Sequence, residues 1–272
     1  MVENTRAHER LTPKELGGEK RSSAGPGGMR VELWVPEQAR TRGAFDLVVH
    51  FHGAAWLVEQ AVAGVDDHTV AAVVNLGAGS ALYERAFLDP TAFESLLAGV
   101  TREVSAAIER AARLSRLTLV GYSAGHGAVR AILGEPRYVA KINAVLLIDG
   151  MHTSYVPDGW VLAGGGALDT SKVQAFADFA RAAVRGEKRF LVTHSEIFPG
   201  TFASTTETAD WLLATLGLRR TPVLLWGPRG MQQLSEVRAG GFELLGFAGN
   251  SAPDHVDQLH AMREFLARLL RR

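Results

Sequence analysis

Residues 117–125 read Leu-Thr-Leu-Val-Gly-Tyr-Ser-Ala-Gly, an apolar run that leads into a Gly-x-Ser-x-Gly turn. Apolar residues at helical spacing follow the turn and continue to Gly134-Glu135-Pro136, where the proline favours the end of a helix. The stretch therefore predicts a strand, a sharp turn and a helix, with Ser123 at the apex and room supplied by Gly121 and Gly125. A serine hydroxyl presented in this way is favoured as a nucleophile, against the alternative of a structural serine.

The composition limits the class of protein. With 272 residues the chain is long enough for one α/β domain and short for two. Its 29 basic and 29 acidic residues cancel, and no long basic run precedes Arg271-Arg272, so nothing favours binding to nucleic acid or to an anionic membrane surface. The absence of cysteine excludes disulfides, thiolate nucleophiles and thiolate metal ligands. No stretch approaches the roughly 20 apolar residues of a membrane span.

Residues 1–28 are polar, lack the apolar region of a signal peptide, and end in a Ser/Gly/Pro-rich run. We interpret them as a flexible N-terminal lead-in, followed by a single domain over residues 29–272. A cytoplasmic location is the expectation, although export of a processed form would leave the same sequence.

Beyond residue 28, short apolar runs alternate with helical patterns. Strands are predicted at 31–35, 47–51, 70–76, 117–120, 144–148, 190–193, 222–225 and 243–247, and helices at 91–114, 124–134, 172–185, 205–216 and 256–270. Runs that are apolar throughout are typical of strands covered on both faces, and helical crossovers make such strands parallel. We predict a doubly wound, mostly parallel α/β sheet of about eight strands with helices on both faces. In such sheets, sites form at the carboxyl ends of the strands.

The strand at 47–51 is followed by His52-Gly53-Ala54-Ala55-Trp56. Small residues just past a strand expose backbone N–H groups, which can stabilise the oxyanion of an acyl-transfer intermediate. We expect the N–H groups of Ala54 and Ala124 to be these donors, with Trp56 and Tyr122 as candidate substrate-binding residues. The alternative is an ordinary tight turn with a packed tryptophan.

His50 and His52 project from the same face of one strand, so they could ligate a metal, with His68 as a third ligand. No carboxylate pair or cysteine nearby completes such a set, and we expect no metal. His52 is better explained as an anchor of the turn through a hydrogen bond.

A serine nucleophile needs a base, and two histidines lie late in the chain. His255 stands in the predicted loop between the strand at 243–247 and the helix at 256–270, where its ring is free to rotate into a site. His260 lies one helical turn further on, where packing is the ordinary explanation. We therefore favour His255, and place His126 and His152 behind it.

The acid that orients the base is open between two residues. Asp149 directly follows the buried strand at 144–148, and Glu196 follows the strand at 190–193. We favour Asp149 over Glu196, while either could instead cap a helix or form a turn. Asp254 and Asp257 are too close to His255 in sequence to be its partners.

The order Ser123, strand-end acid, His255, with His52-Gly53 upstream and Gly121-Tyr122-Ser123-Ala124-Gly125 at the turn, resembles the α/β-hydrolase superfamily of serine esterases and lipases over residues 30–270. That resemblance implies an eight-stranded, mostly parallel sheet and a Ser–His–acid triad that works without a cofactor. Two features depart from it: the acid follows the strand at 144–148, which we count as the sixth of the family's sheet, whereas members usually carry it after the seventh; and the oxyanion loop is not glycine-rich. The interval 150–188 leaves room for a small flap and not for a large cap.

The residues and the resemblance together predict a hydrolase of carboxylic esters or related acyl compounds, with a covalent acyl-enzyme on Ser123. Alternatives are an amidase, a peptidase or an acyltransferase on the same triad, or a binding protein that has kept the fold. The expected partner is a small acyl substrate. Its identity and the oligomeric state are not readable from the sequence.

Overall fold

The computed structural model describes residues 7–271 and divides into two compact units. The first, here called the N unit, comprises residues 12–146 and 262–271. The second, the C unit, comprises residues 7–11 and 147–261.

The N unit contains five sheet strands in the order β1-β2-β4-β3-β5. Their bounds are Glu19–Ala24 (β1), Arg30–Val35 (β2), Ala44–Phe51 (β3), Thr69–Val74 (β4) and Arg113–Tyr122 (β5). The strands β3, β4 and β5 are parallel, and β1 and β2 join them antiparallel at the edge. Phe51 pairs with Gly121 in register, so the carboxyl ends of β3 and β5 lie side by side.

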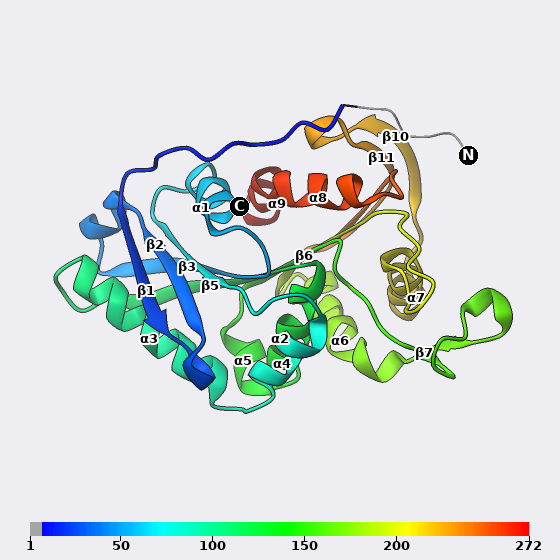
Figure 1. The fold of residues 1–272 in the computed structure, drawn as a ribbon, viewed down its shortest axis with the longest axis horizontal. Coiled ribbons are helices and arrows are strands. Elements are labelled where there is room, and N and C mark those ends of the chain that lie inside the picture. The colour runs from blue at the N-terminus through cyan, green and yellow to red at the C-terminus, as the bar shows by residue number, and fades with distance from the viewer. Residues whose placement is uncertain (1–6, 272) are drawn as a thin grey trace. The chain divides into compact units, whose positions relative to one another are not determined.

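The helices of the N unit pack in pairs, α1 with α9 and α2 with α4 (Figure 1). Their bounds are Ala55–Ala63 (α1), Ser80–Phe87 (α2), Ala92–Ala107 (α3), His126–Leu133 (α4), Pro136–Lys141 (α5) and Met262–Leu270 (α9). The expected helix stop after residue 133 is confirmed: Gly134 caps α4, and Pro136 opens α5, because proline is tolerated in the first turn of a helix.

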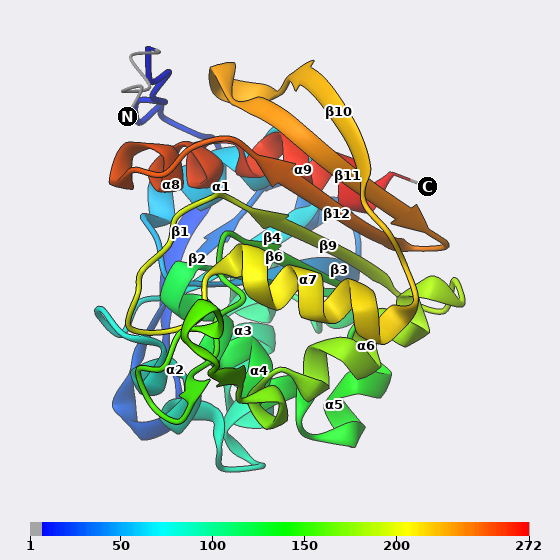
Figure 2. The same cartoon turned by 90° about the vertical axis from the view of Figure 1, so that its right-hand side faces the viewer.

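The C unit contains four further sheet strands, in the order β9-β12-β11-β10, which run side by side in Figure 2. Their bounds are Arg189–His194 (β9), Thr221–Trp226 (β10), Gln232–Ala239 (β11) and Phe242–Phe247 (β12). The strands β9 and β12 are parallel, whereas β10, β11 and β12 form an antiparallel meander. Strand β6 (Ala144–Ile148) contains the division between the units.

Three helices and a small hairpin complete the C unit. The helices are α6 (Gln174–Val184), α7 (Thr205–Leu216) and α8 (Ala252–His260), and the hairpin pairs β7 (Tyr155–Val156) with β8 (Ala167–Leu168). The hairpin and α6 occupy the interval 150–188, where the sequence leaves room for a small flap. Within residues 7–271, no helix combines the length and the apolar composition needed to cross a membrane.

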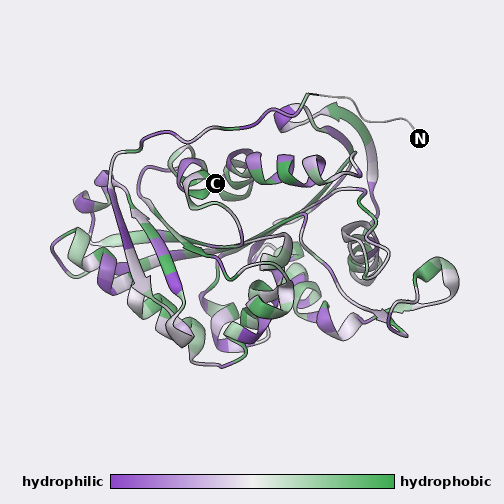
Figure 3. Ribbon diagram, in the orientation of Figure 1, coloured by the Kyte–Doolittle hydropathy of each residue, from purple (hydrophilic) through white to green (hydrophobic). Residues whose placement is uncertain are grey.

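The predicted mostly parallel α/β fold is confirmed, and its main sheet has ten strands among the described residues instead of about eight. The strands of this sheet that were not predicted are β1, which lies inside the expected lead-in and is largely hydrophilic (Figure 3), and β11. β1 is almost entirely polar and β11 mixes polar and apolar residues, so both lack the apolar run of a strand buried on both faces. The single helix predicted at 256–270 is two helices, α8 and α9, that meet at Ala261.

Candidate active site

Ser123 directly follows β5 and is partly buried, with a backbone φ of 47°. The turn packs so closely against the end of β3 that a Cβ at residue 125 would overlap the carbonyl oxygen of Phe51. A Cβ at residue 121 would lie 3.1 Å from the backbone of Gly125. Close approach therefore requires glycine at residue 125 and leaves little room for a side chain at residue 121, in keeping with the room that the sequence assigns to these glycines.

Positive φ angles mark three strand ends. His52 (φ 71°), Ser123 (φ 47°) and Asp149 (φ 41°) directly follow β3, β5 and β6. Residues other than glycine avoid this region, and such strain persists where the surroundings impose it, often at functional sites. Glu109 and Arg229 also have positive φ angles, but among the non-glycine residues of 7–271 with such angles these three are the ones that directly follow a strand, and the sequence had already placed them in or beside the site.

The candidate oxyanion loop is held by Asn75. The N–H of Gly53 donates to Oδ1 of Asn75, and Nδ2 of Asn75 donates to the carbonyl of Gly53, both at 2.8 Å. Ala54 is the N-cap of α1 and is exposed, and Ala124 lies in the 3₁₀ turn Ser123–Gly125. Because β3 and β5 end side by side, both backbone N–H groups belong to one edge of the N-unit sheet.

His52 anchors this edge. Its Nδ1 lies 2.9 Å from the hydroxyl of Tyr83, and its ring stacks on Tyr122 at 5.8 Å and 15°. His50 is fully buried; its Nε2–H donates to the carbonyl of His52 at 2.8 Å, and burial lowers its pKa to about 4. These roles are structural. The candidate Trp56 is partly buried in the first turn of α1.

In the C unit, Nδ1 of His255 lies 2.7 Å from Oδ2 of Asp149. A carboxylate can only accept, so the proton is on Nδ1 and Nε2 is the basic nitrogen. The sequence predicted that His255 lies in a loop, but it lies within α8. The helix begins earlier because Ser251 and Asp254 form a capping box with Pro253 in the first turn, a signal readable as Ser-x-x-Asp.

Asp149 is 2% exposed and accepts four hydrogen bonds. Besides that from His255, they come from the N–H of Ser195 (2.8 Å), its hydroxyl (2.7 Å) and the hydroxyl of Thr205 (2.9 Å). Burial raises the pKa of Asp149, but the hydrogen bond and charge of His255, together with the hydrogen bonds from Ser195, outweigh it and lower the pKa to about 2. The carboxyl group therefore stays ionised at neutral pH. Ser195 and Thr205 were missed by sequence reasoning.

The competing candidates have other contacts. Glu196 is exposed, and its N–H donates to the carbonyl of Gly249 at 2.9 Å. Nδ1 of His260 accepts from the N–H of Leu11 at 2.9 Å. His126 donates from Nδ1 to the carbonyl of Ser123 at 2.8 Å, and His152 to that of Ala203 at 2.9 Å.

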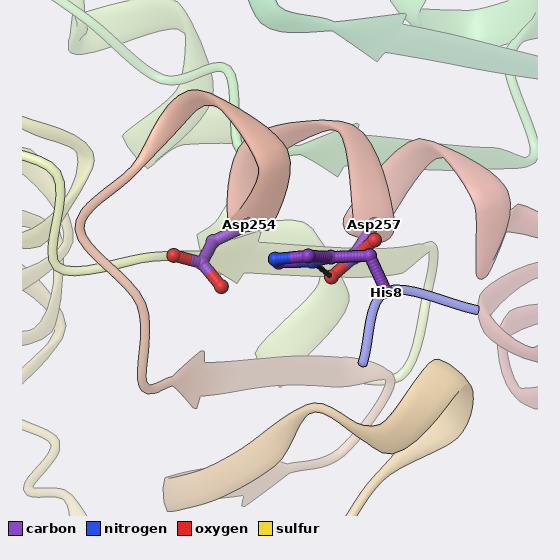
Figure 4. Close-up of side chains that lie close together, drawn as sticks. All are labelled: His8, Asp254 and Asp257. Carbon is purple, nitrogen blue, oxygen red and sulfur yellow. Dashed lines mark hydrogen bonds and ion pairs between the residues drawn. The ribbon is translucent and has the colours of Figure 1, made fainter. Parts of the chain in front are cut away.

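One His/Asp group among residues 7–271 has the spacing of metal ligands: His8, Asp254 and Asp257 (Figure 4). Nδ1 of His8 lies 2.7 Å from Asp257, and Nη1 of Arg10 lies 3.1 Å from the same carboxylate. Asp254 accepts from the N-cap of α8. Because protein groups already satisfy these carboxylates, we interpret the cluster as ion pairing that holds residues 7–11 to α8.

The chain has the α/β-hydrolase fold, shared with known esterases and hydrolases. Enterobactin esterase FES from Shigella flexneri, solved with enterobactin, matches 96% of this chain with a TM-score of 0.55 and 12% identity, and the chain spans 62% of its length. S-formylglutathione hydrolase from Agrobacterium tumefaciens matches 96% of this chain and 97% of its own, with a TM-score of 0.50 and 14% identity. No family model and no curated protein sequence matches the chain. At such low sequence identity the structural match shows the fold alone, so the function must be argued from the site.

Proposed function

We propose that the protein hydrolyses carboxylic esters or related acyl compounds through Ser123, His255 and Asp149. The observation that carries the proposal is the His255–Asp149 pair, in which a buried, ionised carboxylate fixes the imidazole tautomer at 2.7 Å. Packing of α8 alone does not require a histidine oriented by a buried carboxylate, whereas a general base does. The strained Ser123 turn and the fold-level likeness to proteins named as an esterase and a hydrolase add support.

In the proposed reaction, Nε2 of His255 takes the proton of Ser123 Oγ as that oxygen attacks the acyl carbonyl. The N–H groups of Ala54 and Ala124 stabilise the oxyanion. The imidazolium, stabilised by Asp149, returns its proton to the departing alcohol, which leaves an acyl-enzyme on Ser123. Water, deprotonated by His255, then attacks the acyl carbon and releases the carboxylic acid and free serine.

The test is fluorophosphonate labelling of the purified protein with peptide mapping, alongside turnover of p-nitrophenyl esters of increasing acyl length. The expected result is one label on Ser123, ester turnover, and loss of both in Ser123→Ala. Ser115, exposed on the same strand, provides the matched control, because Ser115→Ala should retain label and turnover. A folded protein that takes no label and turns over no ester would refute the proposal.

A further inference from the structure

Another histidine near Asp149 is buried, and the proposed reaction does not use it. His194 ends β9 and is 4% exposed, with its Nε2 2.7 Å from Nη1 of Arg220. Burial, followed by the charge of Arg220, lowers the pKa of His194 to about 4. The ring is therefore neutral near pH 7, and it forms a fixed hydrogen bond with the guanidinium.

Arg220 decides which nitrogen of His194 carries the proton. A guanidinium can only donate, so Nε2 accepts and the proton is on Nδ1. Nδ1 lies 3.1 Å from the carbonyl oxygen of Ser195, and the hydroxyl of Thr206 donates to the same oxygen at 2.9 Å. The Ser195 carbonyl is consequently held by two donors.

Ser195 is also the residue that holds Asp149 with both its N–H and its hydroxyl. The hydroxyl donates to Oδ2, the oxygen that accepts the hydrogen bond of His255. A continuous chain of hydrogen bonds therefore runs from Arg220 through His194, Ser195 and Asp149 to His255.

Neighbouring residues leave space for the His194–Arg220 pair and hold it in place. Gly246 of β12 lies opposite His194 in register, and a Cβ there would be 2.8 Å from Nε2 of the histidine. Arg220 is anchored on its other side by Asp210 of α7, at 2.8 Å, and its Nη1 also donates to Ser235 at 3.2 Å. The guanidinium thus approaches His194 in one orientation.

We propose that Arg220 and His194 are positioning residues that hold the Ser195 segment, and through it Asp149, in the orientation that His255 requires. The inference rests on the proposed function. Without Arg220, no donor fixes the tautomer of His194, so the hydrogen bond from Nδ1 of His194 to the Ser195 carbonyl weakens. Asp149 is then held less firmly in its orientation. Neither residue touches the substrate or the reacting atoms in this proposal.

The test compares Arg220→Ala with a control, Arg238→Gln, because the side chain of Arg238 is 60% exposed and pairs with Glu236, outside the chain of hydrogen bonds that runs from Arg220 to His255. We expect Arg220→Ala to lower kcat roughly tenfold with KM unchanged, about the effect of one hydrogen bond to a charged group. Low concentrations of methylguanidinium should restore part of that kcat and leave the wild type unaffected. An unchanged kcat in the folded variant would overturn the proposal.

Two substitutions of His194 test its two hydrogen bonds one at a time. They also provide the test if Arg220→Ala does not fold. His194→Asn keeps a donor near the Ser195 carbonyl, whereas His194→Gln keeps an acceptor for Arg220. If the function of the pair is to hold Ser195, Asn lowers kcat less than Gln. The reverse ranking would refute the proposal.

A readout independent of turnover separates this inference from the proposed function. The proton between Nδ1 of His255 and Asp149 gives a downfield ¹H NMR signal that reports the geometry of that hydrogen bond. The signal should shift or broaden in Arg220→Ala and His194→Gln, and stay in place in Arg238→Gln. A protein inactive on every ester still gives this measurement, and an unshifted signal in both variants would overturn the positioning role.

Discussion

The N unit holds Ser123 by steric exclusion, whereas the C unit holds Asp149 by hydrogen bonds. Around Ser123, backbone packs on backbone so closely that glycine is required at residue 125 and a Cβ at residue 121 would be crowded. Around Asp149, four donors converge on one buried carboxylate. The contrast fits the proposed chemistry, in which the hydroxyl oxygen of a nucleophile needs a defined place, while the carboxylate of the acid needs a defined charge and orientation.

The largest expected effect on activity comes from Asp149→Asn. The amide preserves the shape but cannot hold the charge, and its NH₂ opposes the proton on Nδ1 of His255. We expect turnover to fall by roughly 10⁴-fold, the scale found for the acid of a serine triad. The p-nitrophenyl ester assay measures it, with Glu196→Gln as the matched control at the other candidate acid. A comparable loss in Glu196→Gln alone would transfer the role to that residue.

The Ser123 turn and the surroundings of Asp149 also differ in how well the sequence predicts them. The Ser123 turn is local, so one pentapeptide with its flanking apolar runs predicted strand, turn and helix, and the helix at 205–216 matches α7. The donors to Asp149 are distant in sequence: Ser195 is 46 residues away and His255 is 106. A strand-end position predicts that an acid belongs to a site, but periodicity carries no information on which hydroxyl groups fold against it.

The steric half of the comparison is tested by Gly125→Ala. The added methyl group meets the carbonyl oxygen of Phe51, and because that oxygen is backbone, the turn itself must move. We expect the free energy of unfolding to fall by about 3 kcal/mol, at the upper end for overpacking, together with loss of fluorophosphonate labelling. Gly134→Ala, at a helix cap with a negative φ, is the control. Retained stability and labelling in Gly125→Ala would show that the turn is not sterically determined.

The polar half is tested by Ser195→Ala, which removes one of the four donors to Asp149 and leaves the backbone N–H in place. We expect kcat to fall roughly tenfold to a hundredfold, since hydrogen bonds to charged groups contribute about 1.5–3 kcal/mol. KM should be unchanged, because the hydroxyl contacts the acid and not the substrate. A change confined to KM would place Ser195 in substrate binding instead.

The hydrogen bonds at Asp149 also make stability depend on pH. Its pKa is lowered to about 2 from an ordinary 3.8, so its contribution is complete above about pH 4 and is lost as the pH falls through 2. The shift corresponds to on the order of 2 kcal/mol. Urea unfolding of the wild type and Asp149→Asn between pH 5 and pH 2 should give curves that converge in acid. Asp178→Asn, at an exposed site, should parallel the wild type, and parallel curves for Asp149→Asn would contradict the expectation.

The smallest expected effect concerns the attachment of residues 7–11 to α8, which carries His255. His8 and His68 offer a matched comparison: their side chains are 26% and 25% exposed, but the partner of His8 is the fully buried Asp257, whereas that of His68 is Asp67, 70% exposed. An ion pair in solvent contributes little, and a buried carboxylate that loses a partner is destabilised. His8→Ala should therefore lower the free energy of unfolding by about 1 kcal/mol. The loss is no larger because Arg10 remains beside Asp257. His68→Ala should lower the free energy of unfolding by less. Equal losses in thermal unfolding would mean that the hydrogen-bonded framework of the C unit ends at α8 and does not extend to the N-terminal segment.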